Sequence, residues 1–311
     1  MTVDVKSETL ADLIDPEVEV EQIVWGCWFT EGPVWHPDGQ FLLFSDVPAS
    51  TRRRWDEREG YRRVVARPTN KTNGMTFDAS GRLVVCEHET SVISRMDGGG
   101  TGSGRAVVAS HYQGKQLNSP NDIVIHSDGS IYFTDPLSGR DDPDHGLERE
   151  SDLGFRGVYR VPPDGGDLQL LVDDFDTPNG LAFSPDESLL YIVDTIECHI
   201  RVFDVQPDGL LANGRVFAEN IGSWDHVWGP KKGGIVDGMK CDERGDVWVT
   251  GPGGIWVFSP DGTHLGTVHT PPSTANMHWG GPDWNWLYVA AGTGVLRFQT
   301  KVSGRREPFM K

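Results

Sequence analysis

The amino-acid sequence predicts an all-β protein that folds as a single six-bladed β-propeller, in which an N-terminal strand closes the last blade. The first observation is a pattern that recurs six times along the 311 residues: a polar or small residue, a short alternating strand, a turn and a second apolar strand. Successive copies begin about 40 to 60 residues apart, which is typical of four-stranded propeller blades. The copies open at Glu31, Asn73, Asn121, Asn179, Asp237 and Ala275.

The second observation is the chemistry of the turns between the paired strands. Glycine adopts a positive φ without a Cβ clash, so a dipeptide that ends in glycine favours a β-hairpin at this place. Two more strands follow most hairpins, as in the segment 157–175, and complete a four-stranded blade. The dipeptides are Asp38-Gly39, Ser80-Gly81, Asp128-Gly129 and Arg244-Gly245.

The third observation is an orphan strand near the N-terminus. The sixth copy has a third strand at 294–299 and no obvious fourth, whereas an apolar strand at 18–25 precedes the first copy. If that strand completes the last blade, the ring closes without a bare hydrogen-bonding edge. We therefore expect residues 1–16 to form an N-terminal extension and residues 17–311 to form one propeller domain. Longer loops at 137–155 and 223–236 are expected to crown the channel mouth.

Composition restricts the partners and the compartment. The chain carries 46 acidic and 28 basic residues, for a formal net charge of −18. A field of this sign repels nucleic acid and anionic lipid, so neither is an expected partner. The four cysteines form no C-x-x-C pair, and the N-terminus lacks the basic and apolar parts of a signal peptide. We expect a cytoplasmic protein that is a monomer or a homodimer.

The residue that opens each copy is the main candidate for function. In a propeller the innermost strand of every blade lines the channel, so these residues should meet at one mouth. Two carboxylates, Glu31 and Asp237, and three amides, Asn73, Asn121 and Asn179, would converge there. A hard divalent cation would relieve the charge repulsion and satisfy the amides. Any one of these residues alone is more often a turn residue, but their recurrence favours a metal site.

The type of cation follows from the donor atoms. Carboxylate and amide oxygens are the ligands that Ca²⁺ accepts, so Ca²⁺ is the expected ion. Mg²⁺, Mn²⁺, Zn²⁺ and Fe²⁺ remain alternatives, since availability also selects a metal. No histidine or cysteine occupies the position, which argues against a dedicated zinc site.

Several stretches of the chain resemble the senescence marker protein/gluconolactonase/regucalcin-like family, and its bacterial gluconolactonase branch in particular. The resemblance implies a six-bladed propeller with one divalent ion, most often calcium. It implies hydrolysis of a sugar lactone, gluconolactone or a related aldonolactone, to the open acid by metal-activated water. The stretches are EGPVW at 31–35, TNGMTFDASGRLVVCEH at 72–88, LNSPNDIVIHSDGSIYFTDP at 117–136, TPNGLAFSPDESLLYIVDT at 177–195 and VDGMKCDERGDVWVTG at 236–251.

The resemblance also implies roles for single residues. It implies metal ligands at Glu31, Asn179 and Asp237, with Asn121 as a fourth ligand or a substrate contact. It places Asp237 beside the attacking water as a general base. Animal members have an arginine where this chain has Ser119, so the choice of substrate stays open.

The ends of the second hairpin strands should return to the same mouth and add further candidates. Most such residues accept hydrogen bonds from loops, but two are singled out: Asp194 as a second catalytic residue and His88 as a substrate contact. With Asn73, Asn121 and Ser119, His88 forms the expected substrate-binding set. The strand-end residues are Asp46, Glu87, His88, Asp135 and Asp194.

Two other functions fit the same residues. One is a phosphotriesterase or non-sugar lactonase that uses the same ion, and the other is a non-catalytic metal-binding propeller. A serine esterase of the α/β type is disfavoured, because the sequence has no G-x-S-x-G nucleophile elbow.

Overall fold

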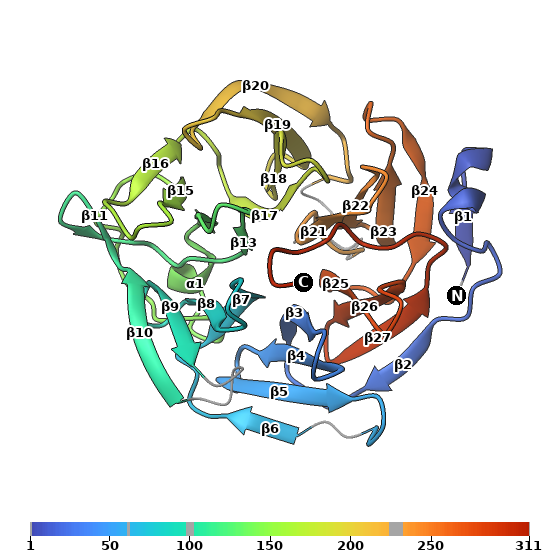
Figure 1. The fold of residues 1–311 in the computed structure, drawn as a ribbon, viewed down its shortest axis with the longest axis horizontal. Helices are drawn as coiled ribbons and strands as arrows, with labels where there is room; N and C mark the ends of the chain where they lie inside the picture. The colour runs from blue at the N-terminus through green and yellow to red at the C-terminus, as the bar shows by residue number, and fades with distance from the viewer. Residues whose placement is uncertain (1, 61–62, 98–102, 224–232, 311) are drawn as a thin grey trace.

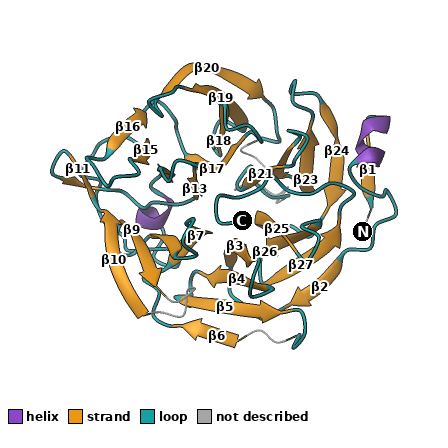
Figure 2. Cartoon of the chain, viewed as in Figure 1, coloured by secondary structure: helices purple, strands orange, loops and turns teal. Residues whose placement is uncertain are grey.

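The computed structural model describes residues 2–60, 63–97, 103–223 and 233–310 and shows a closed ring of six antiparallel sheets (Figure 1). The predicted six-bladed β-propeller is confirmed. Helix among the described residues is limited to the 3₁₀ turn η1 (Glu8–Asp12) and the short α1 (Ser138–Asp141) (Figure 2). Neither of these helices is long and apolar enough to cross a membrane.

The strands of each blade follow one another from the channel outward. Blade 1 contains β3 (Thr30–His36), β4 (Phe41–Asp46), β5 (Thr51–Asp56) and β6 (Arg63–Ala66). Blade 2 contains β7 (Thr72–Phe77), β8 (Leu83–Glu87), β9 (Val92–Asp97) and β10 (Ser103–Ala109). Blade 3 contains β13 (Ile123–Ile125), β14 (Ile131–Asp135), β15 (Gly157–Val161) and β16 (Gln169–Val172). A separate hairpin of β11 (His111–Tyr112) and β12 (Lys115–Gln116) precedes blade 3.

The second half of the ring repeats this plan. Blade 4 contains β17 (Pro178–Phe183), β18 (Leu189–Asp194), β19 (His199–Val205) and β20 (Leu211–Ala218). Blade 5 contains β21 (Met239–Cys241), β22 (Val247–Gly251), β23 (Gly254–Phe258) and β24 (His264–His269). Blade 6 contains β25 (Thr274–Gly280), β26 (Trp286–Ala291), β27 (Gly294–Gln299) and the N-terminal β2 (Glu21–Val24).

The N-terminal strand closes the ring as predicted. Strand β2 pairs antiparallel with β27, with Glu21 opposite Arg297, so the outer edge of β27 is covered by the other end of the chain. The residues before it were expected to form an extension. They add β1 (Val3–Val5) as a fifth strand to β24, and the η1 turn places Leu10 in the core, fully buried.

The core lies between the blades, because each inner strand is covered on both faces by its neighbours. Trp35 of blade 1 stacks on Tyr288 of blade 6, with ring centroids 4.9 Å apart. Trp248 of blade 5 meets Trp279 of blade 6 edge-on at 5.6 Å. Such aromatic pairs bury large areas and rigidify the junctions between blades.

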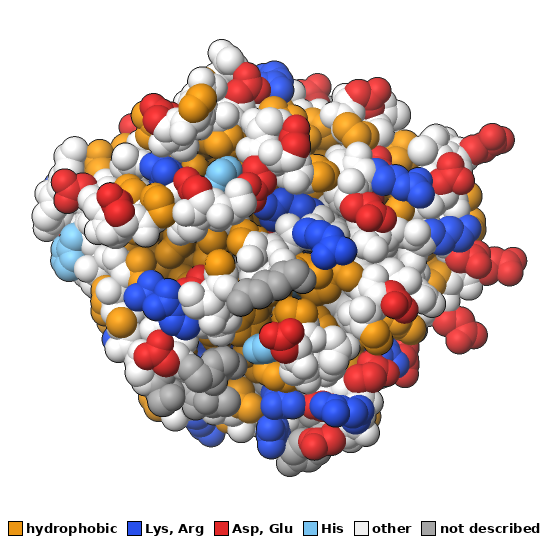
Figure 3. Space-filling view, viewed as in Figure 1, with side chains coloured by type: hydrophobic (Ala, Val, Ile, Leu, Met, Phe, Trp, Pro, Cys, Tyr) orange, Lys and Arg blue, Asp and Glu red, His pale blue; other side chains and the backbone are white. Residues whose placement is uncertain are grey.

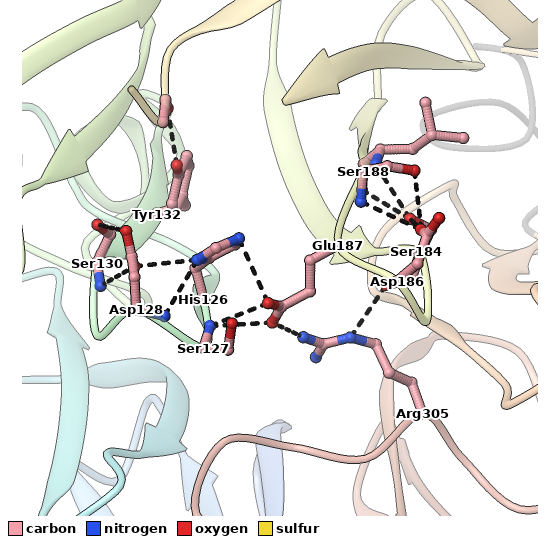
Figure 4. A network of polar contacts seen from close by, with 12 residues as sticks. His126, Ser127, Asp128, Ser130, Tyr132, Ser184, Asp186, Glu187, Ser188 and Arg305 are labelled. Atoms are coloured by element: carbon pink, nitrogen blue, oxygen red, sulfur yellow. Dashed lines mark hydrogen bonds and ion pairs between the residues drawn. The ribbon is translucent and has the colours of Figure 1, made fainter. Parts of the chain in front are cut away.

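The C-terminal segment crosses the end of the channel that lies opposite the strand-opening residues. Arg305 donates to the carbonyl oxygen of Ser184 at 3.2 Å and pairs with Glu187, both in the turn of blade 4 (Figure 4). Phe309 packs on Phe77 of blade 2. Figure 1 shows the C-terminus at the centre of the ring, and Figure 3 shows this face with basic side chains among acidic ones. The C-terminal segment therefore covers part of this end of the channel.

Candidate functional site

The six strand-opening residues form a ring at one mouth of the channel. Contacts beside these residues join each blade to the next from blade 1 to blade 6. Thr134 Oγ1 donates to Asn179 O at 2.8 Å, and a Cβ on Gly32, whose φ is +49°, would collide with Asn73 O. The backbone N–H···O=C bonds are Gly74 to Asn121 (2.8 Å), Gly180 to Asp237 (3.1 Å) and Gly238 to Ala275 (2.7 Å).

Two carboxylates of this ring are buried close to each other. Burial, the largest cause, raises the pKa of Glu31, and the negative charge of Asp122 raises it further. Burial also raises the pKa of Asp237 well above its usual range, and the charge of Glu31 is the next cause. Glu31 Oε2 accepts a hydrogen bond from Gly32 N at 2.7 Å, which opposes the shift only in part. Ionisation of both groups is costly unless a positive charge lies beside them.

Asn179 is oriented beside this pair. Its Nδ2 donates to Thr195 Oγ1 at 3.0 Å, and that hydroxyl donates to Val236 O at 2.8 Å. The amide nitrogen is thereby engaged, which leaves the amide oxygen as the group that could bind a cation. A side-chain contact from Asn179 also lowers the pKa of Asp237, although burial outweighs it. The structure thus brings together Glu31, Asn179 and Asp237.

Asn121 occupies the next place in the ring. Its backbone N donates to Thr134 O and its carbonyl oxygen accepts from Gly74, which fixes the chain at the mouth. The side chain is buried. Its position beside Asn179 suits either of the two roles expected for it.

Three polar residues deeper in the channel were missed by the sequence analysis. Asn276 Nδ2 donates to Asp122 Oδ2 at 3.3 Å, and Lys240 Nζ lies 4.0 Å from the same oxygen. Asp122 and Asn276 follow the strand-opening residue in their copies, where the other four copies have glycine. A Cβ on Gly74 would lie 2.8 Å from Asp122 Oδ1, so glycine leaves room for the larger side chain. The replacement of glycine by Asp122 and Asn276 in two of the six copies is the sequence feature that could have identified these residues.

Asp194, expected as a second catalytic residue, has a carboxylate that accepts hydrogen bonds from four backbone N–H groups, the role expected for most strand-end residues. Asp46 and Asp135 act in the same way at the ends of β4 and β14, where they accept from Trp28 N (3.0 Å) and Asn118 N (2.8 Å). In this way Asp194 holds the loop before Asn179, and its expected catalytic role stays a prediction. Its donors are Asp176 (2.7 Å), Thr177 (3.1 Å), Ile196 (3.2 Å) and Glu197 (3.3 Å).

Ser119, expected to bind substrate, anchors a loop. Its hydroxyl donates to Pro136 O at 2.6 Å and accepts from Gly139 N at 3.1 Å. Both partners belong to the turn around α1, at the start of the loop 137–155. Ser119 thus sets the position of that loop, and its hydroxyl is engaged on both sides.

The loop 137–155 covers part of the mouth, as its length predicted. It leaves blade 3 and reaches over blade 2, where His145 O lies 3.0 Å from His88 Nδ1. It continues to the segment before β3, where the ring of His145 meets Phe29 edge-on at 5.1 Å. Lys71 Nζ donates to Asp144 O at 3.0 Å. Of the second predicted loop, 223–236, residues 224–232 lie outside the described part of the chain.

The donor set at the mouth suits a hard cation. Within the described ranges no group of three or more histidine, cysteine, aspartate or glutamate side chains is placed to hold a metal. The mouth offers two carboxylates and the amide oxygens of Asn179 and Asn121 instead. Two buried carboxylates with raised pKa values, beside oriented amides, fit a divalent ion with oxygen ligands.

Comparison with known proteins gives a consistent result. The model of the SMP-30/Gluconolactonase/LRE-like region matches residues 29–293. The gluconolactonase of Zymomonas mobilis is 33% identical over 96% of this chain and 86% of its own length. The pentonolactonase XacC of Haloferax volcanii is 27% identical over 86% of this chain and 83% of its own. The solved gluconolactonase of Xanthomonas campestris superposes with a TM-score of 0.86 at 33% identity, over 96% and 95% of the two chains.

Proposed function

Because the chain belongs to the SMP-30/gluconolactonase/LRE-like family, we propose that this lactone hydrolase opens a sugar lactone with a divalent cation held by Glu31, Asn179 and Asp237. Gluconolactone or a related aldonolactone is the proposed substrate. The observation that carries the proposal is the pair of buried carboxylates, Glu31 and Asp237, whose charges cannot coexist at the mouth without a cation. Relatives named as gluconolactonase and pentonolactonase support the reaction type.

The proposed cation is Ca²⁺, with Asn121 as a fourth ligand or a substrate contact. All the donors are oxygens, which suits Ca²⁺, and Mg²⁺, Mn²⁺, Zn²⁺ or Fe²⁺ would be distinguished by elemental analysis. When bound, the cation supplies a Lewis acid for the lactone carbonyl and lowers the pKa of a water molecule.

The residues of the chain supply orientation and proton transfer. Water attacks the carbonyl carbon, the ring C–O bond breaks, and the ring oxygen takes up a proton to become a hydroxyl. Asp237 is the proposed base that accepts the proton from water. A bound cation lowers the pKa of a carboxylate and makes it a weaker base. Burial raises the pKa of Asp237 and so opposes this effect. Asn73 and His88 are the proposed contacts to the sugar.

The test measures proton release from glucono-1,5-lactone with a pH indicator, before and after treatment with a chelator. We expect an enzymatic rate that the chelator abolishes and that added Ca²⁺ restores. Asp237→Asn should lower kcat by about 100-fold or more, because a general base contributes that much. Asp283→Asn changes an exposed aspartate in the turn between β25 and β26, at the end of the blade opposite the mouth; it is the matched control and should keep the wild-type rate. A rate on aldonolactones that is insensitive to the chelator would refute the metal-dependent mechanism.

A further inference from the structure

Two buried side chains beside the mouth carry acceptor atoms without a donor. Asn73 is 5% exposed and His88 is 2% exposed. In the described part of the chain, neither Asn73 Oδ1 nor His88 Nε2 has a hydrogen-bond partner. Buried polar atoms are almost always paired, because an unpaired one forfeits its hydration without compensation. Other buried side-chain atoms of the described residues also lack a partner, but these two are acceptors in one hairpin beside the mouth, where a ligand can supply the missing donors.

The tautomer of His88 follows from its other ring nitrogen. Nδ1 lies 3.0 Å from the carbonyl oxygen of His145, which can only accept, so Nδ1 carries the hydrogen. Nε2 is then the atom with the lone pair. Burial lowers the pKa of His88 to about 4, so the ring is neutral at physiological pH. Nε2 is therefore an acceptor.

The ring of His88 is held in one orientation. A Cβ on Gly139 would lie 2.6 Å from His88 Cγ and 2.7 Å from Nδ1, so the turn around α1 packs directly on this edge. The opposite edge, which carries Nε2, is thereby directed away from the loop. The backbone N of His88 also donates to Lys71 O at 3.3 Å. A fixed acceptor can discriminate between ligands, whereas a mobile one would adjust to many.

Both acceptors belong to the hairpin of β7 and β8. Thr72 and Glu87 face each other across it, and Asn73 and His88 each follow one member of that pair. The register of the hairpin shifts between Thr72 and Met75, so Asn73 lies in a β-bulge and strand alternation does not set the direction of its side chain. Asn73 lies in the ring between Glu31 and Asn121, and His88 directly follows the strand that pairs with β7, so both residues border the candidate site.

We propose that Asn73 Oδ1 and His88 Nε2 form a pair of acceptors for substrate hydroxyl groups, and that this pair makes the site selective for polyhydroxylated lactones. The inference rests on the proposed function. A sugar lactone carries hydroxyl donors on its ring carbons, whereas an unsubstituted lactone offers only acceptors. An unsubstituted lactone in the site would leave both atoms unpaired, and sites with buried polar groups reject such analogues strongly.

The test compares variants that separate the two nitrogens of His88. His88→Asn keeps a donor near the Nδ1 position for His145 O and removes the Nε2 acceptor. His88→Gln places an amide oxygen near the Nε2 position and should recover part of the selectivity. Asn73→Ala removes the second acceptor, and Asn73→Asp keeps an acceptor there. Thermal melting establishes that each variant is folded.

The readout is the ratio of kcat/KM for glucono-1,5-lactone to that for δ-valerolactone, which has no hydroxyl group. We expect this ratio to fall about tenfold or more in His88→Asn and in Asn73→Ala, the lower range for a lost hydrogen bond to a buried group. An unchanged ratio, whether or not both rates fall, would show that the pair does not recognise hydroxyl groups and would overturn the inference.

A second measurement is independent of the reaction. 1,5-Anhydro-D-glucitol has the ring hydroxyls of the sugar lactone and no ester, and its binding can be followed by saturation-transfer NMR. Binding to the wild type that His88→Asn and Asn73→Ala abolish would support the acceptor pair even if no lactone were hydrolysed, a result that refutes only the proposed reaction. Absence of both binding and turnover in the wild type would overturn both.

Discussion

Strand-end aspartates show how one residue type serves two purposes in this fold. Asp46, Asp135 and Asp194 each end the second strand of a blade and accept backbone N–H groups from the loop that leads into the first strand. Asp237, which opens a strand, has a side chain that faces the other ring residues instead. The sequence places all four at the mouth but does not tell a loop-holding carboxylate from a chemical one, because the difference depends on which N–H groups lie nearby.

Asp135 gives a prediction for stability against pH. Burial raises its pKa to about 7 from 3.8, although N–H donation from Asn118 and the charge of Arg140 oppose the shift. In the unfolded chain Asp135 loses its proton near pH 3.8, while the folded protein keeps it to about pH 7. Its contribution to stability is thus full below pH 3.8 and is lost as the pH rises through 7. One pKa unit corresponds to about 1.4 kcal/mol, so the loss is at most about 4 kcal/mol.

The substitution Asp135→Asn removes this dependence, since asparagine resembles the protonated acid. Urea unfolding at pH 4 and pH 8 should show that the free energy of unfolding of the wild type falls more than that of the variant. The variant should be the more stable protein at pH 8. Parallel pH profiles for the two proteins would contradict the assignment of a buried, proton-holding Asp135.

At the scale of elements, the N-terminal strands differ in what they do for the ring. Strand β2 covers the open edge of β27, and Arg297 of β27 pairs with Glu21 at 2.7 Å. Strand β1 only extends blade 5, which already has four strands of its own. Loss of β2 therefore leaves blade 6 with three strands and the edge of β27 bare, whereas loss of β1 leaves blade 5 with its own four strands.

Two deletions test this difference. Deletion of residues 2–7 removes β1 but keeps Leu10 and the η1 turn, so the protein should fold with a Tm lowered by several degrees. Deletion of residues 2–24 removes the closing strand and should leave an aggregating or unfolded protein. Circular dichroism and size-exclusion chromatography measure both effects. A well-folded monomer after the longer deletion would mean that β2 is dispensable for closure.

The pairing of the closing strand could be predicted from the sequence, whereas the contacts of a loop could not. The closing strand was predictable because a missing fourth strand at one end of the chain matched an orphan at the other. The loop 137–155 was predictable by its length, but its contacts with Phe29, Lys71 and His88 were not. They join three blades, and no local pattern encodes contacts at such separations.

For the whole molecule, the ring itself made the site predictable. A sixfold repeat places equivalent positions around one axis, so the convergence of Glu31, Asn179 and Asp237 follows from counting copies. Asp122, Lys240 and Asn276 break the repeat, so the equivalence of positions did not predict them. The C-terminal segment over the far end of the channel has no counterpart in the repeat, so the repeat pattern did not predict it.

The charge of the molecule leads to a last prediction, on cation binding. The chain has a net charge of −18, and Glu31, Asp122 and Asp237 gather at one channel with only Lys240 near them among the described residues. Since burial and the charges of neighbouring carboxylates raise the pKa values of Glu31 and Asp237, the metal-free pair retains a proton at neutral pH. A cation must displace that proton, so binding should release protons and become tighter as the pH rises.

Calorimetry of Ca²⁺ binding at pH 7 in buffers of different ionisation enthalpy measures the proton release directly. Because the ion binds only the folded ring, Ca²⁺ at 100 times its Kd should stabilise the protein by about 2.7 kcal/mol and raise Tm accordingly. Asp237→Asn should weaken binding and reduce the proton release, while Asp283→Asn should change neither. Ca²⁺ binding of equal strength in Asp237→Asn, with the same proton release, would place the ion elsewhere, because the mouth would then lack the charge that holds it.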